Sequence, residues 1–251
     1  MRREPPEYIT FADRTSFDTP MKFRLQPIVR LHDGSAYGYE MLYRGPRLPW
    51  TEVDRALLTY LGETDLSLPR LFINIANESL TKERIALLVD ASLNTDLIVE
   101  LSEAHTTAED ASQIAGTVNA AAARGVRFAL DDFGCGQDGF QRLFALDSVG
   151  IIKLDGSLIR SAMVRADAAK TLRSLVNHWK TNGVVTVAEC IEDEAMLDTA
   201  EAMGIDMVQG FYLDGLAPFR IARMAMWRSN RTMNMVGNAE PLRTVLHRQN
   251  G

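Results

Sequence analysis

Short apolar runs that each end on a polar side chain recur along the chain, and they alternate with helical patterns. Runs such as 97–99 and 184–188 contain almost no polar residue, which is typical of parallel strands covered on both faces. Apolar positions at helical spacing predict helices over residues 51–62, 81–92, 107–123, 138–146, 164–181 and 193–203. Three of these segments are followed by a glycine that can close a helix, at Gly125, Gly183 and Gly204. The alternation predicts βα units around a parallel sheet.

The first two strands follow a different rule. Residues 23–31 and 36–42 both have strand character, and between them stands a turn that contains Asp33-Gly34. An Asp-Gly turn between two such runs is a hairpin signal, so the first strand should be antiparallel to its neighbour. Counting this hairpin, the chain carries eight predicted strands. The expected fold is an α/β protein, a modified TIM (β/α)8 barrel with an antiparallel first strand.

The chain divides into three segments on this pattern. Residues 1–20 form an extended, proline-containing lead-in, 21–218 the barrel, and 219–251 a basic C-terminal helix and tail. The net charge is −6, but residues 217–251 hold six arginines against one acid, which gives +5 there and leaves −11 for the body. An acidic body argues against duplex nucleic acid as a partner. The basic tail could contact an anionic partner, although a solvated helix with a frayed end is the favoured interpretation.

Length and composition exclude some classes of protein. The 251-residue chain has no apolar run of about 18 residues, so no membrane span is expected. Its N-terminal segment has no apolar stretch behind the basic pair, which argues against a secretory signal. Cys135 and Cys190 form no CxxC pair, which favours a reduced, cytoplasmic protein.

The candidate chemistry lies at the strand ends. The seven strand-like segments that carry it end in Glu40, Asn74, Glu100, Asp131-Asp132, Lys153, Glu189 and Gln209. The C-terminal ends of barrel strands converge on one mouth, where barrel enzymes place their active sites. Five carboxylates with a single lysine would repel one another unless further positive charge sat between them. Carboxylate oxygens suit Mg²⁺ or Mn²⁺, so the pattern favours a metal-dependent barrel enzyme.

These strand ends also resemble the motifs of a known family, in the family's order. The matching segments are Glu40-Met41-Leu42, Phe72-Ile73-Asn74, Glu100-Leu101-Ser102-Glu103, Leu130-Asp131-Asp132-Phe133-Gly134, Ile152-Lys153-Leu154-Asp155, Val187-Ala188-Glu189 and Val208-Gln209-Gly210-Phe211. The family is the EAL domain, a bacterial phosphodiesterase of cyclic di-GMP named for a Glu-Ala-Leu signature. The resemblance runs from about Phe23 to Pro218.

The resemblance implies roles for individual residues. Glu40, Asn74, Glu100 and Asp131 would ligate one Mg²⁺ or Mn²⁺, and Asp131, Asp132 and Glu189 a second. The pair would activate a water that attacks one phosphodiester, and the product would be linear pGpG. Catalytic roles fall to Lys153, which would orient that water, and to Glu189 and Gln209 beside it. Leu42 and Arg44 would contact the substrate, and Glu103 would anchor the loop that begins at Asp132.

The resemblance also implies inhibition by Ca²⁺ and a homodimer built near that loop and the helix after Lys153. The chain departs from the family in three places. Only 34 positions separate Glu40 from Asn74, fewer than in typical members, and the missing stretch supplies helices beside the substrate cleft. The loop after Phe133 has an unusual sequence, and Asp214-Gly215-Leu216 replaces the family's Lys-Pro. A protein partner could complete the cleft wall.

Three function classes therefore remain open: an active phosphodiesterase, a silent cyclic di-GMP receptor and a pure protein-interaction module. Retention of every acid in the expected site favours the enzyme. Gly134-x-Gly136-x-x-Gly139 matches a dinucleotide-binding fingerprint, but Asp131 and Asp132 just before it would repel a pyrophosphate. The four histidines have no paired spacing, which disfavours a zinc site.

Overall fold

The computed structural model describes residues 7–12, 20–101, 108–136, 139–147 and 149–214. Within these ranges nine strands form one sheet in the order of the sequence. The strands are β1 (Tyr8–Phe11), β2 (Met21–Arg30), β3 (Ala36–Tyr43), β4 (Leu71–Asn74), β5 (Leu97–Leu101), β6 (Arg127–Phe133), β7 (Ile151–Leu154), β8 (Val185–Ala188) and β9 (Met207–Val208). A pairing between β2 and β9 closes β2 to β9 into a barrel, and β1 pairs with residues 21–24 of β2, before the part of β2 that pairs with β9.

Strand direction confirms the predicted hairpin. β2 is antiparallel to both of its barrel neighbours, β3 and β9, whereas every pairing from β3 to β9 is parallel. The C-terminal ends of β3 to β9 therefore open on one mouth, while β2 brings its N-terminal half there. Opposite Glu40 of β3 stands Gln26 of β2.

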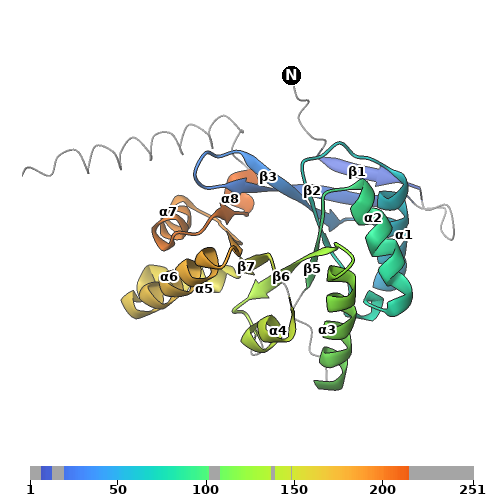
Figure 1. The fold of residues 1–251 in the computed structure, drawn as a ribbon. Helices are drawn as coiled ribbons and strands as arrows, with labels where there is room; N and C mark the ends of the chain where they lie inside the picture. The colour runs from blue at the N-terminus through green and yellow to red at the C-terminus, as the bar shows by residue number, and fades with distance from the viewer. Residues whose placement is uncertain (1–6, 13–19, 102–107, 137–138, 148, 215–251) are drawn as a thin grey trace, which may run out of the picture.

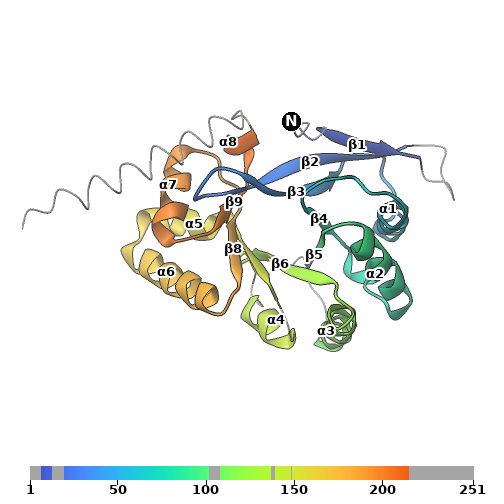
Figure 2. The ribbon, with the colours of Figure 1, turned by 45° about the horizontal axis from the view of Figure 1, so that its top comes forward.

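Helices cover the outside of the parallel part of the barrel. They are α1 (Trp50–Glu63), α2 (Ile85–Asn94), α3 (Ala108–Ala122), α4 (Gly139–Ala145), α5 (Gly156–Val164), α6 (Ala166–Thr181), α7 (Glu194–Met203) and the single turn α8 (Phe211–Asp214), with short 3₁₀ turns at Asn77–Ser79 and Lys82–Arg84. In Figures 1 and 2, α1 to α7 form an arc around the strands, and the β2–β3 hairpin closes the remaining side. None of the helices in the described ranges is long and apolar enough to cross a membrane.

Two apolar clusters fill the space between the barrel and its helices. One packs α1 and α2 against the first strands through side chains such as Leu57, Leu61 and Leu88, and the other includes Val176 of α6 and Leu197 of α7. Each large aliphatic side chain removed from water in this way contributes about 1.5–3 kcal/mol. A third cluster consists of Ile28, Phe72, Ile98, Ala129, Ile151, Val187 and Met207, contributed by seven barrel strands. It fills the barrel interior below the mouth.

Two elements escaped the sequence pattern. The predicted lead-in contains β1, and the single helix predicted over 164–181 is preceded by a separate helix, α5. Arg165 takes an extended conformation (φ −130°, ψ 115°) and separates α5 from α6. The Asp155 side chain accepts a hydrogen bond from the Ser157 backbone N–H at 2.8 Å and caps α5. The glycines predicted to close helices do so with positive φ, as at Gly204 (φ 81°) after α7.

Candidate metal centre

Most barrel strands carry an inward apolar residue and, two positions later, an inward polar residue. The pairs are Phe72 and Asn74, Ile98 and Glu100, Ala129 and Asp131, Ile151 and Lys153, Val187 and Glu189, and Met207 and Gln209. Alternate residues of a strand face the same side, so the first members form an apolar layer and the second members a polar layer above it. Glu40 joins the polar layer. Gly38, two positions before it, leaves room for Phe72, whose Cε2 would lie 3.0 Å from a Cβ at position 38.

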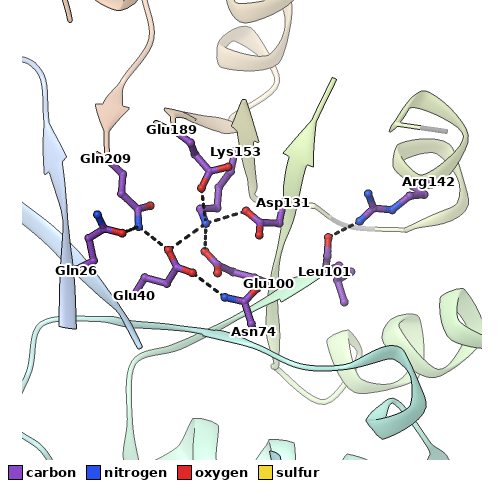
Figure 3. A network of polar contacts seen from close by, with 10 residues as sticks. All are labelled: Gln26, Glu40, Asn74, Glu100, Leu101, Asp131, Arg142, Lys153, Glu189 and Gln209. Atoms are coloured by element: carbon purple, nitrogen blue, oxygen red, sulfur yellow. Dashed lines mark hydrogen bonds and ion pairs between the residues drawn. The ribbon is translucent and has the colours of Figure 1, made fainter. Parts of the chain in front are cut away.

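Lys153 lies at the centre of the polar layer (Figure 3). Its Nζ is 2.5 Å from Glu100 Oε1, 2.8 Å from Asp131 Oδ1, 2.9 Å from Glu189 Oε1 and 3.5 Å from Glu40 Oε2. The lysine is fully buried, and Glu100 is as well. One ammonium group therefore stands among four carboxylates, so the cluster keeps excess negative charge when all of them are ionised.

Amide side chains hold Glu40 from both sides. Asn74 Nδ2 donates to Glu40 Oε1 at 2.7 Å, and Gln209 Nε2 donates to Glu40 Oε2 at 2.5 Å. The backbone after β9 packs closely against the backbone after β8, and this contact positions Gln209. Gly210 has no side chain, and a Cβ there would overlap the backbone N and O of Ile191. These contacts fix the orientation of the Glu40 carboxylate within the mouth.

A backbone irregularity in β6 brings two consecutive acids to one place. Asp131 and Asp132 would face opposite sides of a regular strand. The pairing of β6 with β7 shifts register between Leu130 and Phe133, and Asp132 has a left-handed φ of 53°. Oxygens of Asp131, Asp132 and Glu189 consequently lie within 4.8 Å of one another. Left-handed backbone in a non-glycine residue costs of order 1–3 kcal/mol and concentrates at functional sites.

Burial and mutual repulsion disturb the ionisation of this cluster. Burial, together with the charge of Glu40, raises the pKa of Glu100 well above its usual value. Burial also raises the pKa of Glu189 to about 8, with a contribution from Asp131, although Lys153 opposes it. Burial would lower the pKa of Lys153, but the carboxylates around it, Glu100 first, raise that pKa well above its usual value. Burial would raise the pKa of Glu40, but Lys153 and the hydrogen bond from Gln209 outweigh it and lower that pKa. The lysine thus stays charged, while some carboxylates hold protons near neutral pH.

The donor set of this cluster fits a divalent cation. Among the described residues, Glu100 Oε2 and Glu189 Oε2 are buried and have no hydrogen-bond partner. Buried polar atoms normally find a partner, so such oxygens are suited to bind a cation. Mg²⁺ and Mn²⁺ bind oxygen ligands of this kind. Within the part of the chain that the structure describes, Asp131, Asp132 and Glu189 form a group of acids close enough together to hold one ion.

The structure brings most, but not all, of the predicted site residues together. Glu40, Asn74, Glu100, Asp131, Asp132, Lys153, Glu189 and Gln209 meet at the mouth. Leu42 is half-buried on β3, and Arg44 is exposed just after it, where its Nη1 donates to the Tyr43 carbonyl at 2.9 Å. Glu103 lies outside the described residues, and so does the basic tail. In Figure 3, Arg142 of α4 donates to the carbonyl of Leu101 at the end of β5.

Sequence reasoning missed Gln26 and Asp214. Gln26 Oε1 accepts from Gln209 Nε2 at 3.1 Å, and Gln26 Nε2 donates to Asp214 Oδ2 at 3.1 Å. The search for polar residues at strand ends could not find Gln26, because an antiparallel strand presents its N-terminal half to the mouth. A buried polar residue paired with Glu40 across the predicted hairpin would have been the signal.

Comparison with known proteins agrees with this geometry. Residues 51–215 match the family model described as the EAL domain. The chain is 33% identical over 87 residues to the cyclic di-GMP phosphodiesterase PdeB of Shewanella oneidensis, and 26% identical over 164 residues to the cyclic di-GMP phosphodiesterase PdeF of Escherichia coli. The matches cover 35% and 62% of this chain, but only 10% and 22% of the two relatives.

Solved structures share the fold. A standalone EAL protein from Vibrio cholerae in a c-di-GMP-bound form has a TM-score of 0.66 at 23% identity, covering 78% of this chain and 92% of that one. Klebsiella pneumoniae BlrP1, in a complex with calcium and cyclic di-GMP, has a TM-score of 0.66 at 24% identity, covering 83% and 58%. At these identities the likeness establishes the fold alone. The family model matches more than half of this chain, and the chain forms the same barrel as the solved EAL structures. This chain therefore belongs to the EAL domain family.

Proposed function

We propose that this chain is a metal-dependent phosphodiesterase that hydrolyses cyclic di-GMP to linear pGpG. The observation that carries the proposal is the polar layer itself, in which four of the expected acids, Glu40, Glu100, Asp131 and Glu189, surround Lys153 at the barrel mouth and Asp132 lies beside two of them. A family member that only bound the nucleotide would have no need to keep five carboxylates at the high cost of crowding them together. The relatives named as cyclic di-GMP phosphodiesterases support the substrate.

The chain's own residues would divide the work. Glu40, Asn74, Glu100 and Asp131 would hold one Mg²⁺ or Mn²⁺, and Asp131, Asp132 and Glu189 a second. Such ions, when bound, supply the positive charge that polarises a phosphodiester and eases the loss of a proton from water. Lys153 would orient the attacking water, with Gln209 beside it, and Arg44 and Leu42 would contact the nucleotide. Glu103 would anchor the loop after Asp132.

Product analysis tests the proposal directly. The purified protein is incubated with cyclic di-GMP in Mn²⁺, Mg²⁺, Ca²⁺ or EDTA, and pGpG is measured. We expect product in Mn²⁺ and Mg²⁺ and none in EDTA. Ca²⁺ prefers more ligands at longer distances, so it should occupy the same acids and inhibit. Equal turnover in EDTA and Mn²⁺ would rule out the metal-dependent mechanism.

The second candidate is a receptor that binds cyclic di-GMP without cleaving it. The observation that favours it is the short connection between β3 and β4, in which the structure shows one α-helix, α1. A thinner wall beside the mouth would leave the nucleotide less firmly positioned for in-line attack, unless a partner protein completes it. Calorimetry beside product analysis separates the two candidates: tight binding without pGpG under any metal favours the receptor, and neither binding nor cleavage leaves a protein-interaction module.

The same family resemblance suggests a homodimer through α4 and α5. A groove of about 530 Å³ lies there, lined by residues that include Phe133, Phe140 and Leu158. Beside it, Phe144 of α4 and Val164 of α5 are 80% and 81% exposed. Exposed apolar side chains that cluster at one face mark interaction surfaces. Light scattering of Phe144→Asp should show a monomer. Leu93→Asp, on the exposed face of α2, is the control and should stay dimeric.

A further inference from the structure

A chain of hydrogen bonds runs from α8 to Glu40 through two buried glutamines. Arg24 Nη2 and Gln26 Nε2 both donate to Asp214 Oδ2, at 3.0 and 3.1 Å. Gln26 Oε1 accepts from Gln209 Nε2 at 3.1 Å, and the same Nε2 donates to Glu40 Oε2 at 2.5 Å. Gln26 and Gln209 are both buried, and the Asp214 side chain is only 11% exposed. Asp214 is thus connected to the polar layer although it lies outside it.

The chemistry of the two end groups, Asp214 and Glu40, determines which atom donates and which accepts along this series of hydrogen bonds. An ionised carboxylate can only accept hydrogen bonds, whereas a glutamine amide both donates and accepts. Asp214 therefore requires the nitrogen of Gln26, which turns the oxygen of Gln26 toward Gln209. That oxygen and the Glu40 carboxylate both require the nitrogen of Gln209. Arg24 also donates to Asp214 Oδ2, at 3.0 Å, so this oxygen accepts from two donors.

One consequence concerns the side-chain oxygen of Gln209, which neither Gln26 nor Glu40 uses. Gln209 Oε1 is buried and has no hydrogen-bond partner among the described residues. If the amide were reversed, this oxygen would face the Glu40 carboxylate, and two acceptors would repel each other. The orientation seen gives Glu40 a donor and leaves an acceptor in the site for an N–H or O–H of the substrate.

We propose that Asp214 is a positioning residue that fixes the amide orientations of Gln26 and Gln209, and through them the Glu40 carboxylate. The inference rests on the proposed function for its effect on turnover, but the orientation itself can be measured without metal or nucleotide.

The test uses the single variants Asp214→Asn and Gln26→Glu and their combination. Asparagine at position 214 offers both a donor and an acceptor, so Gln26 loses its fixed direction. Glutamate at position 26 alone would set two carboxylates in contact. In the double variant the introduced asparagine donates to the introduced glutamate, and that glutamate accepts from Gln209. The order of donors and acceptors from position 214 to Gln209 is therefore restored. Three quantities are measured on the full chain: hydrogen exchange of the Gln209 side-chain amide by NMR, the Kd for Mn²⁺, and kcat and KM.

We expect Asp214→Asn to speed exchange of the Gln209 amide and to weaken Mn²⁺ binding and kcat/KM by about 10- to 100-fold, the usual cost of losing such a supporting contact. The double variant should recover most of each loss. Asp33→Asn, an exposed acid in the hairpin turn at the other end of β3 from Glu40, is the matched control and should behave as wild type.

Two outcomes would overturn the inference. One is wild-type exchange, Kd and kinetics in Asp214→Asn. The other is a double variant that recovers none of these losses, with the melting temperature lowered equally in all three variants. Asp214 would then contribute to stability alone. If the wild type neither binds Mn²⁺ nor cleaves cyclic di-GMP, the proposed function fails, and restored exchange protection in the double variant still supports the positioning role.

Discussion

The apolar layer and the polar layer of the barrel lie two residues apart on the same strands, yet they meet opposite physical demands. Ile151 and Lys153 of β7 illustrate this, since both are almost completely buried. Burial of Ile151 stabilises the fold because an apolar side chain leaves water. Burial of Lys153 is tolerated because four carboxylates surround it, and those carboxylates are themselves costly to bury.

The difference separates residues that stabilise the fold from residues that we propose carry out its chemistry. Glu100 and Glu189, whose pKa values are raised by burial, have oxygens with no hydrogen-bond partner among the described residues. Apolar side chains could fill the same space at less cost, so we attribute the polar layer to the proposed function. Perturbing each layer in turn should therefore affect different measurements.

The largest effect is expected from removing the charge of the polar layer at Lys153. Lys153→Met keeps the length of the side chain but leaves the four carboxylates without a counter-charge. Turnover of cyclic di-GMP should fall by about 10²- to 10⁴-fold because the attacking water is no longer oriented. The metal-free protein should lose about 3–5 kcal/mol of unfolding free energy, which Mn²⁺ should partly restore. Product analysis and chemical denaturation measure the two losses.

A surface lysine provides the control for that experiment. Lys180 Nζ is 2.8 Å from Asp206 Oδ1, but its side chain is 59% exposed. Because exposed ion pairs are worth about 0–1 kcal/mol, Lys180→Met should leave turnover and stability nearly unchanged. Turnover of Lys153→Met within a few-fold of wild type would contradict the role proposed for this residue.

The apolar layer should show the reverse pattern. Ile151→Ala removes buried carbon atoms and should cost about 2–5 kcal/mol of unfolding free energy. At a temperature where the variant stays folded, kcat should remain within a few-fold of wild type, because the strand backbone that carries Lys153 is unchanged. Denaturation and kinetics on Ile151→Ala beside Leu93→Ala, whose side chain is 79% exposed, test this. A selective loss of kcat would show that the two layers are not separable.

The smallest effect, expressed per pH unit, is a change of the free energy of unfolding with pH in the metal-free protein. The pKa of Glu189 is raised from 4.5 to about 8, so between these values the folded state holds a proton that the unfolded state has lost. Stability therefore falls as pH rises through this window, by up to about 1.4 kcal/mol per pH unit for one proton. Glu100 acts in the same direction. The lowered pKa of Glu40 acts below this window and the raised pKa of Lys153 above it.

Denaturation of the metal-free protein between pH 5 and pH 8 measures this slope. Glu189→Gln carries no titrating group at this position, and its slope should be shallower than that of the wild type. Mn²⁺ should flatten the slope in the wild type, since a bound cation replaces the proton. Wild-type stability that does not change with pH across this window would show that the carboxylates are ionised without a metal.

The sequence predicted the candidate site well wherever a strand is parallel. Asn74, Glu100, Lys153 and Glu189 were found by the rule that such strands converge at their C-terminal ends, and the structure places all four in the mouth. The rule fails for Gln26, because β2 runs the opposite way. Asp214 escaped for another reason, since its contact with Gln26 joins positions 188 residues apart.

Local backbone geometry was the second limit. The doublet Asp131-Asp132 was visible in the sequence, but its register shift and the left-handed φ of Asp132 depend on pairing with β7. The division between α5 and α6 likewise falls at Arg165, a residue with no strong breaking tendency, whereas the cap at Asp155 could have been recognised.

The sequence by itself determined the order of the barrel strands and of most helices, the antiparallel hairpin and the kinds of side chain that reach the mouth. Those features follow from local periodicity, from turn residues and from the period of two along a strand. Only the tertiary structure decided which oxygens face Lys153, which acids share one place and how Asp214 is linked to Glu40. These depend on hydrogen-bond directions and on charge-to-charge distances of a few ångströms, and such distances exist only once the barrel has closed.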